Sequence, residues 1–266
     1  MIPTRWQAAI MELLQRQGRA RISELARSLA VSEETIRRHV RPLVAQGLVG
    51  REHGAVRWNG PSGEAPFDRR LRIRAAAKRA IARAAADLVA DGQTVMIDTG
   101  STTAFVAEAL VVRERLTLVT NGIEIARSLV GRNGHRVYLA GGELKAELAA
   151  AVGPEALAFI GQFRADLAIL SIAAIDTEEG LMNYALDEAR LARAMMAGAE
   201  RVMLVADRVK FGQRAAVHVA QLEEIDTLVT DAAPPEPFAG RLAEAGIALV
   251  VAGDHPEAAA SSSRMV

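Results

Sequence analysis

The chain has 266 residues, of which half are apolar and 24% are charged, and it contains no cysteine. This composition is typical of a globular protein and excludes a mainly disordered chain, disulfides, cysteine-ligated metal sites and thiol catalysis. The formal net charge is zero, but residues 1–60 carry +5 and the remainder −5. The asymmetry favours a basic nucleic-acid-binding part joined to an acidic part.

Membrane and secretion signals are also missing from the sequence. No apolar run approaches the roughly 18 residues that span a bilayer. Residues 1–6 lack the apolar core of a signal peptide. We therefore expect a cytoplasmic protein with no membrane partner.

Residues 1–58 predict a winged helix-turn-helix domain. The spacing of apolar residues and capping residues predicts three helices, at 4–17, at 24–30 with Ser23 as its cap, and from Glu33 with Ser32 as its cap. Short apolar pairs at 48–49 and 56–58 flank a glycine-containing turn and predict a two-stranded wing. Pro42 falls within the third helix and predicts a kink or an early end near Arg41.

The third helix carries the residues that suit DNA. Its start and its face away from Ile36 and Val40 hold Ser32, Thr35, Arg37, Arg38 and Arg41, and the wing adds Arg51 and His53. Arginine binds phosphates and the edge of guanine, and the start of a recognition helix reaches the bases. An ordinary solvated helix face is the alternative, but the two preceding helices and the basic wing favour DNA.

A linker and an α/β domain follow. The composition of residues 59–66 predicts a linker, and residues 67–91 predict one long helix rich in alanine and arginine, so 59–91 form the connection. Residues 92–254 alternate helical stretches with apolar strands at 94–98, 116–120, 136–140, 166–172, 201–206, 227–230 and 247–252. Such strands predict a parallel sheet covered by helices. Residues 255–266 predict a disordered tail.

One candidate ligand site follows the first strand of this sheet. Asp98 is followed by Gly100, Ser101, Thr102 and Thr103, which open a helix at the carboxyl end of the strand. Ligands of open α/β sheets bind at that edge, and a helix amino terminus binds phosphate or carboxylate. A helix cap with no ligand is the alternative reading.

Further polar residues follow the other strands. They are Asn121, Gly141, Gly142, Asp176, Asp187, Glu188 and Lys210. Each also suits an ordinary turn or helix cap. We expect them to share one edge of the sheet, where a cation, an anion pocket and carboxylates suit a small phosphorylated polyol.

The amino-terminal motifs resemble a known family. VSEETIRRHV followed by GLVGREHGAV resembles the helix-turn-helix of the DeoR family of bacterial transcriptional regulators. Three positions depart from the family pattern, namely His39 in place of aspartate, a single glycine at Gly54, and Pro42. The resemblance implies binding to double-stranded operator DNA.

The resemblance extends to about residue 250. DTGSTT, TNG, LAGGEL, the acid pair Asp187-Glu188 and VKFG are similar to the DeoR sensor domain, which is related to ribose-5-phosphate isomerase. Within the family, the stretch 139–170 and TDAAPP imply glycerol 3-phosphate or another sugar phosphate as effector. Residues 171–176 lack the usual glycines, and Ala77 replaces a usual glutamate.

These observations predict a repressor of carbohydrate or glycerol metabolism genes that a phosphorylated metabolite releases from DNA. We expect a homo-oligomer, because paired heads read repeated half-sites, and no cofactor. The five histidines lack metal-binding spacing. Two alternatives remain, a sugar-phosphate isomerase using Asp98, Asp176 and Lys210, and a module whose helical head binds protein.

Overall fold

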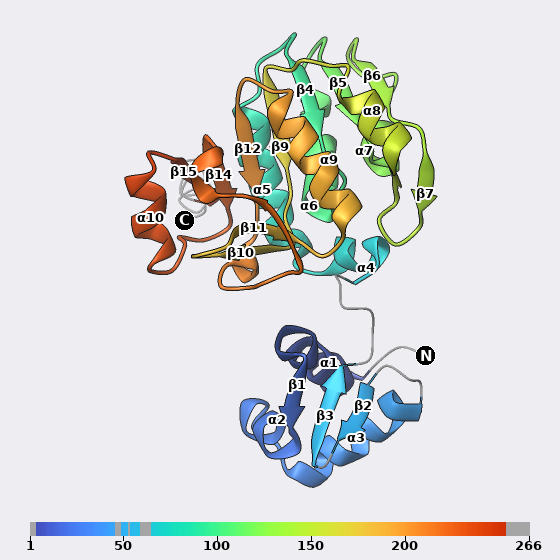
Figure 1. The fold of residues 1–266 in the computed structure, drawn as a ribbon, viewed down its shortest axis with the longest axis vertical. Helices are drawn as coiled ribbons and strands as arrows, with labels where there is room; N and C mark the ends of the chain where they lie inside the picture. The colour runs from blue at the N-terminus through green and yellow to red at the C-terminus, as the bar shows by residue number, and fades with distance from the viewer. Residues whose placement is uncertain (1–3, 46–48, 53, 59–64, 254–266) are drawn as a thin grey trace, which may run out of the picture. The chain divides into compact units, whose positions relative to one another are not determined.

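The computed structural model describes residues 4–45, 49–52, 54–58 and 65–253. The chain divides into two compact units, residues 1–64 and 65–266. Each unit is drawn in Figure 1 and is described by itself. His53, most of the expected linker 59–66 and the expected tail 255–266 lie outside the described residues.

The first unit is a winged helix-turn-helix, as predicted. Its elements are α1 Arg5–Gln17, β1 Arg19–Arg21, α2 Ile22–Ser28, α3 Glu33–Ala45, β2 Val49–Glu52 and β3 Ala55–Trp58. The three strands form an antiparallel sheet of order β1-β3-β2. The helices pack around one apolar core that includes Ile10, Leu25, Ile36 and Val56.

Three details of this unit differ from the sequence prediction. Helix α2 begins at Ile22, so Ser23 lies inside the helix, and the carboxylate of Glu24 accepts from the backbone N–H of Arg21 instead. Helix α3 continues through Pro42 to Ala45, so the expected early end was wrong. The burial of Leu43 in the core, 2% exposed, favours helix beyond the proline. Strand β1 was not predicted.

The second unit contains a seven-stranded parallel sheet. Its order is β15-β14-β12-β9-β4-β5-β6. The strands are β4 Thr94–Ile97, β5 Thr117–Thr120, β6 Arg136–Leu139, β9 Leu167–Leu170, β12 Val202–Val205, β14 Thr227–Thr230 and β15 Ala248–Val251. All seven strands fall within the predicted segments, and the parallel sheet is confirmed.

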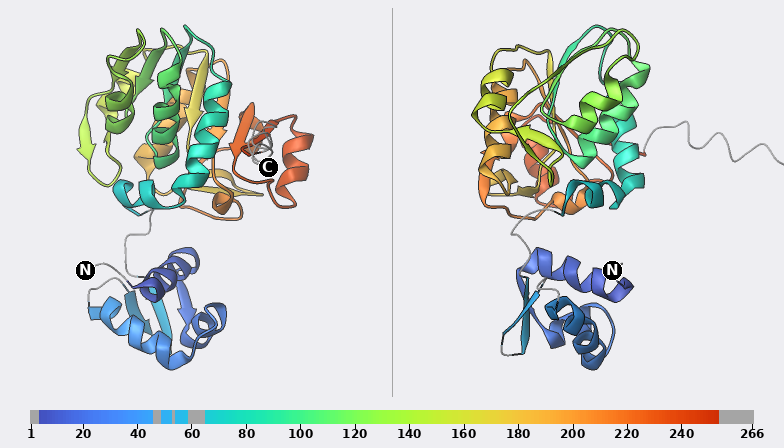
Figure 2. Two further views of the ribbon diagram at one scale, coloured as in Figure 1. Left: turned by 180° about the vertical axis from the view of Figure 1, so that it is seen from behind. Right: turned by 90° about the vertical axis from the view of Figure 1, so that its right-hand side faces the viewer.

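Helices cover both faces of the sheet (Figure 2). One face packs against α5 Ala75–Asp87, α6 Ser101–Ala109 and α7 Ile123–Leu129, and the other against α8 Pro154–Ile160, α9 Leu186–Ala197 and α10 Phe238–Glu244. Neighbouring residues of a strand enter opposite cores, so Leu204 joins one and Val205 the other. Strands with two buried faces explain the continuous apolar runs in the sequence.

Shorter elements outside the main sheet were not predicted. A hairpin pairs β7 Glu143–Lys145 with β8 Ala150–Val152. A second sheet joins β10 Ala174–Asp176, β11 Gly180–Asn183 and β13 Val217–Ala220. Single 3-10 turns lie at Leu110–Val112, Arg208–Lys210 and Leu222–Glu224. Asp176 therefore belongs to a separate antiparallel sheet and not to a strand of the main sheet.

The predicted helix 67–91 is also wrong as a single helix. It consists of α4 Phe67–Arg72 and α5, separated by Ile73 and Arg74. Arg74 has a φ of 53°, in the left-handed region that costs an L-residue about 1–2 kcal/mol. Ion pairs from Arg74 to Asp207 and Asp231 hold this break, and both partners are distant in sequence. None of the helices in the described residues is long and apolar enough to cross a membrane.

Candidate functional site

The recognition helix α3 is capped as the sequence predicts. The backbone N–H of Thr35 donates to the Oγ of Ser32 over 3.2 Å, and the two hydroxyls lie 2.9 Å apart. Ile36, Val40 and Leu43 are buried, so the opposite face is exposed to solvent. This face carries Arg37, Arg38 and Arg41.

The arginines of the first unit differ in their surroundings. Arg37 pairs with Glu33 at 2.6 Å and with Glu34 at 3.6 Å, so nearby carboxylates offset part of its charge. Arg38, Arg41 and the wing residue Arg51 are exposed.

The sheet of this unit brings together two further arginines, Arg57 of the basic wing and Arg19, a pairing that the sequence did not reveal. Strand β1 places Arg19 directly opposite Arg57 of β3, and both are exposed. Only a prediction of β1 could have revealed this pairing, because the two residues are far apart in sequence.

The carboxyl ends of the main strands bring several predicted effector residues to one edge. Asp98 follows β4, Asn121 follows β5, and Gly141 and Gly142 follow β6 shortly after its end. The register of the parallel strands makes these positions neighbours along the edge. Asp187 and Glu188 begin α9, and Lys210 ends the 3-10 turn after β12.

Asp98 is a buried carboxyl group at this edge. One of its oxygens accepts from the backbone N–H of Ser171 at 3.0 Å and lies 3.5 Å from the hydroxyl of that serine. Burial raises the pKa of Asp98 well above its usual range, and the charge of Glu188 raises it further. Asp98 and Glu188 therefore interact electrostatically, and Asp98 favours its protonated form more than an ordinary carboxyl group does.

Gly100 is required by the protein's own packing. A Cβ at this position would overlap the Oγ of Ser171 and would lie 3.0 Å from its Cβ. Ser171 follows β9, the neighbour of β4, so the two strand ends approach each other closely. The glycine allows this approach.

The hydroxyls at the start of α6 have different partners. Ser101 Oγ accepts from the Nζ of Lys78 at 2.8 Å, whereas Thr103 Oγ1 donates to the carbonyl of Gly100 at 3.0 Å. Both residues and Thr102 are buried. Lys78 is 5% exposed and also donates to the carbonyl of Arg70 at 2.6 Å. The sequence reasoning did not identify this lysine, because its role depends on the packing of α5 against α6.

Other predicted effector residues are held by neighbouring protein groups. Asn121 accepts from the N–H of Thr99 at 3.1 Å and donates to the carbonyl of Ala151 at 3.1 Å, so it braces the edge. Gly142 has a φ of 133°, and a Cβ there would lie 2.6 Å from the carbonyl oxygen of Val152. Both residues therefore fix the hairpin β7–β8 beside the edge.

Two carboxylates among the predicted effector residues form ion pairs with basic side chains. Asp187 lies 2.8 Å from the Nζ of Lys145, and this hydrogen bond raises the pKa of the lysine. Asp176 accepts from Arg214 at 2.7 Å, and the hydrogen bond from that guanidinium lowers the pKa of Asp176 to about 2. Both carboxylates are therefore already paired with a cation of the protein.

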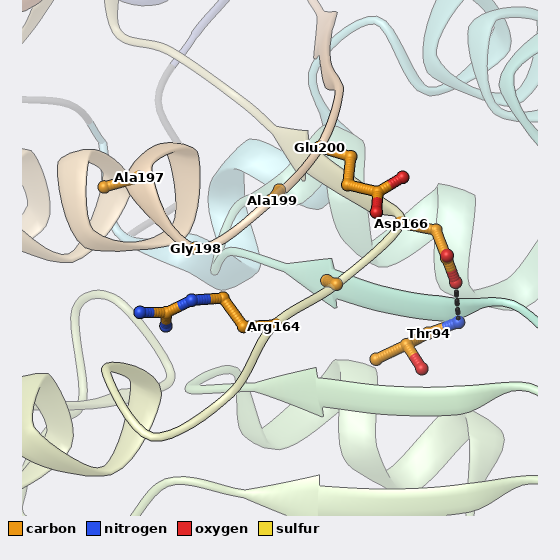
Figure 3. A pocket seen from close by; sticks show the side chains of 8 residues that line it. Thr94, Arg164, Asp166, Ala197, Gly198, Ala199 and Glu200 are labelled. Carbon is orange, nitrogen blue, oxygen red and sulfur yellow. Dashed lines mark hydrogen bonds between the residues drawn. The ribbon is translucent and has the colours of Figure 1, made fainter.

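A hollow of about 300 Å³ lies at the opposite, amino edge of the sheet (Figure 3). It is lined by Thr94, 164–166 and 197–200. Asp166 accepts there from the backbone N–H of Thr94 at 2.7 Å. None of the predicted effector residues lines this hollow.

Comparisons with known proteins match both units. The family model "DeoR C terminal sensor domain" matches residues 73–232, and "DeoR-like helix-turn-helix domain" matches residues 7–61. The chain is 34% identical to the HTH-type transcriptional repressor CsqR of Escherichia coli, over 91% of this chain and 93% of that protein. It is 37% identical to the glycerol-3-phosphate regulon repressor of Escherichia coli, over 85% of this chain and 90% of that protein.

Two solved structures are more distant matches. A ribose-5-phosphate isomerase in complex with phospho-erythronic acid aligns over 50% of this chain and 52% of that chain, with a TM-score of 0.38 and 14% identity. The eIF2B delta structure from Chaetomium thermophilum aligns over 61% of this chain and 58% of that chain, with a TM-score of 0.44 and 17% identity. With its winged head, its parallel-sheet sensor unit and relatives above 30% identity along most of its length, the chain belongs to the DeoR family of transcriptional regulators.

Proposed function

We propose that this protein represses genes of carbohydrate or glycerol metabolism and that a phosphorylated metabolite releases it from operator DNA. The exposed arginine face of α3 supports DNA binding, and relatives named as repressors support the direction of regulation. Glycerol 3-phosphate is the first effector to test, because a relative at 37% identity is a glycerol-3-phosphate regulon repressor. These relatives favour a regulator over an isomerase.

In the proposed DNA complex, α3 enters the major groove. Ser32 and Thr35 at its start and Arg37, Arg38 and Arg41 along its face contact bases and phosphates, with Arg51 and His53 reaching the DNA from the wing. Arginine forms bidentate contacts with guanine and neutralises phosphates. A homo-oligomer brings two heads to repeated half-sites, since a single small head has a limited contact area.

In the proposed effector complex, the phosphate group binds at the amino end of α6. The N–H groups from Gly100 to Thr103 face this end of the helix, and its partial positive charge favours an anion. The observation that carries the proposal is the buried ammonium of Lys78, 2.8 Å from Ser101 Oγ. Lys210 supplies a second cation.

The hydroxyls of the effector bind the carboxyl groups nearby. Asp98 and Glu188 are the first candidates, because they interact with each other at the edge. Asp176 and Asp187 contribute when a ligand displaces Arg214 and Lys145 from them. Asn121, Gly141 and Gly142 shape this edge of the site.

The experiment tests binding first and regulation second. The melting temperature of the full-length protein is measured with glycerol 3-phosphate, glycerol and inorganic phosphate, and operator DNA is selected from random sequences. Glycerol 3-phosphate is expected to raise the melting temperature and to weaken operator binding. No change in the melting temperature with glycerol 3-phosphate excludes it as the effector, and no selected DNA contradicts operator binding.

A further inference from the structure

The corner between α4 and α5 departs from what its own sequence favours. Residues 67–87 are rich in alanine and arginine, which are good helix formers. The corner residues are Ile73 and Arg74, and the break contains neither glycine nor proline. Arg74 nevertheless has a φ of 53°, a conformation that only glycine and a few polar residues adopt readily. Contacts from elsewhere in the fold must therefore hold the break.

Two carboxylates from the carboxyl edge of the sheet hold Arg74. Its Nε donates to Asp207 at 3.1 Å and its Nη2 donates to Asp231 at 2.5 Å. The side chains of Asp207 and Asp231 are 4% and 10% exposed. They follow the neighbouring strands β12 and β14, so their spacing is set by the sheet. Ion pairs of this low exposure are stronger than surface pairs when both partners are in place.

The break leaves the carbonyl of Arg70, at the end of α4, without its helical hydrogen-bond donor, and Lys78 donates to it instead. In one continuous helix, the carbonyl of Arg70 would accept from the backbone N–H of Arg74, four residues later. Here that carbonyl accepts from the Nζ of Lys78 at 2.6 Å. The bent corner and the continuous helix therefore use different donors for the same acceptor, and each arrangement satisfies it.

We infer that the α4–α5 corner is a two-state hinge: Arg74 latches it bent through Asp207 and Asp231, and α4 and α5 join into one helix when the latch opens. Lys78 links this hinge to Ser101, because its ammonium contacts both that hydroxyl and Arg70. An anion at the amino end of α6 competes for the ammonium and favours the straight form. This coupling rests on the function proposed above, whereas the hinge itself rests on the contacts of Arg74 and Lys78.

The position of the hinge along the chain suits it to carry a signal from the effector site to the DNA-binding unit. Helix α4 is the first helix of the sensor unit and follows the segment 59–64 that leads from the DNA-binding unit. A change in the direction of α4 moves the first residues of the sensor unit relative to the rest of that unit. The hinge is thus suited to pass an effector signal toward the head.

The absence of cysteine allows a direct test on the full-length chain. Spin labels are attached to Asp68→Cys on α4 and Arg83→Cys on α5, two exposed positions, and their separation is measured by electron spin resonance without ligand. In a continuous helix these Cα atoms would lie about 22 Å apart along the axis, at about 1.5 Å per residue. A bend brings them closer together.

Arg74→Ala is expected to move the distance distribution toward the straight helix, because it removes the latch and leaves a strong helix former. Arg72→Ala, which removes an exposed arginine of α4, is the matched control and is expected to keep the wild-type distance. A folded Arg74→Ala variant with the wild-type distance overturns the hinge.

If the Arg74→Ala variant does not melt cooperatively, the same spin-label distance is measured in Asp231→Asn, and this second variant tests the hinge. This variant keeps the contact between Arg74 and Asp207 and is expected to show a long-distance population that wild type lacks. An unchanged distribution in Asp231→Asn then overturns the inference. No ligand is present in these measurements, so a failure of glycerol 3-phosphate to bind counts against the proposed effector alone.

Discussion

The Nζ of Lys78 lies 2.8 Å from the Oγ of Ser101, and this hydrogen bond joins the first turn of α5 to the start of α6. The same ammonium contacts the carbonyl of Arg70 on α4. A buried cation of this kind is costly unless it is hydrogen-bonded or paired with a charge. Lys78 therefore connects the proposed phosphate position with the segment that leads toward the DNA-binding unit.

Lys78→Met is expected to weaken binding of glycerol 3-phosphate by about 10-fold to 150-fold, because a hydrogen bond to a charged group contributes about 1.5–3 kcal/mol. Isothermal titration measures the affinity, and circular dichroism checks the fold. Arg79→Met, at an exposed position of the same helix, is the control and is expected to bind as wild type does. Wild-type affinity in Lys78→Met excludes this lysine from the phosphate site.

Lys210→Ala tests the cation that the sequence suggested. If Lys210 also pairs with the phosphate, its loss is expected to abolish the rise in melting temperature caused by glycerol 3-phosphate. A full rise in this variant removes Lys210 from the site and leaves Lys78 as the cation.

Arg38→Ala with Arg41→Ala is expected to weaken operator binding and to flatten its salt dependence. Each lost phosphate contact lowers the slope of log K against log salt by about 1, and each lost bidentate base contact costs about 1–3 kcal/mol. Fluorescence anisotropy at several salt concentrations gives both quantities. Arg37→Ala is expected to have a smaller effect, because Glu33 and Glu34 already pair with Arg37. An unchanged titration curve for the double variant contradicts the assignment of α3.

Gly100→Ala is expected to destabilise the sensor unit by about 1–3 kcal/mol through overpacking against Ser171. Ser171→Gly removes two of the three atoms nearest to the new methyl group and leaves Thr103 Oγ1 at 3.0 Å, so the double variant is expected to recover part of the loss. Chemical denaturation of the four proteins gives the coupling energy, for which contacting residues typically show about 0.5–3 kcal/mol. Strictly additive losses would mean that another contact makes Gly100 necessary.

Asp98→Asn is expected to raise the melting temperature at pH 7. The pKa of Asp98 is raised in the folded state by burial, so this group favours folding below its unfolded value of 3.8 and this contribution falls as the pH rises above it. The amide retains an oxygen that accepts from Ser171. The gain is expected to disappear near pH 4, and a rise of equal size at both pH values would contradict the burial argument.

Asp176→Asn is expected to act with the opposite sign. Arg214 lowers the pKa of Asp176 to about 2, so this carboxylate stabilises the folded state above 3.8, and its contribution is lost as the pH falls toward 2. The variant is expected to melt below wild type at pH 7, with a difference that closes between pH 4 and pH 2. A difference that persists at pH 2 would show that packing, and not charge, is responsible.

Local sequence patterns were sufficient where a property depends on neighbouring residues in the chain. Ser32 caps α3 as predicted, because the cap contact spans three residues. The seven main strands lie where apolar runs predicted them. The five inner strands are buried on both faces and must be apolar throughout, whereas the edge strands β6 and β15 are partly exposed. The placement of Asp98, Asn121 and Gly141 at one edge followed from the parallel sheet.

Contacts between distant residues were outside the reach of such patterns. Arg74 breaks the expected long helix because of Asp207 and Asp231, which follow it by more than 130 positions. Likewise, no spacing rule joins Lys145 to Asp187 or Asn121 to Ala151. Asp176 lies in a second sheet whose short strands left no strong periodic signal.

The sequence alone determined the three helices of the DNA-binding unit, the main strands of the sensor unit and the edge at which polar residues follow those strands, because these depend on burial and capping along the chain. Only the tertiary structure decided which polar groups at that edge are occupied by partners and where the linker bends. The physical reason is that hydrogen bonds and ion pairs form between side chains that the packed sheet brings together, and their energies outweigh the local preference of segments such as 67–87.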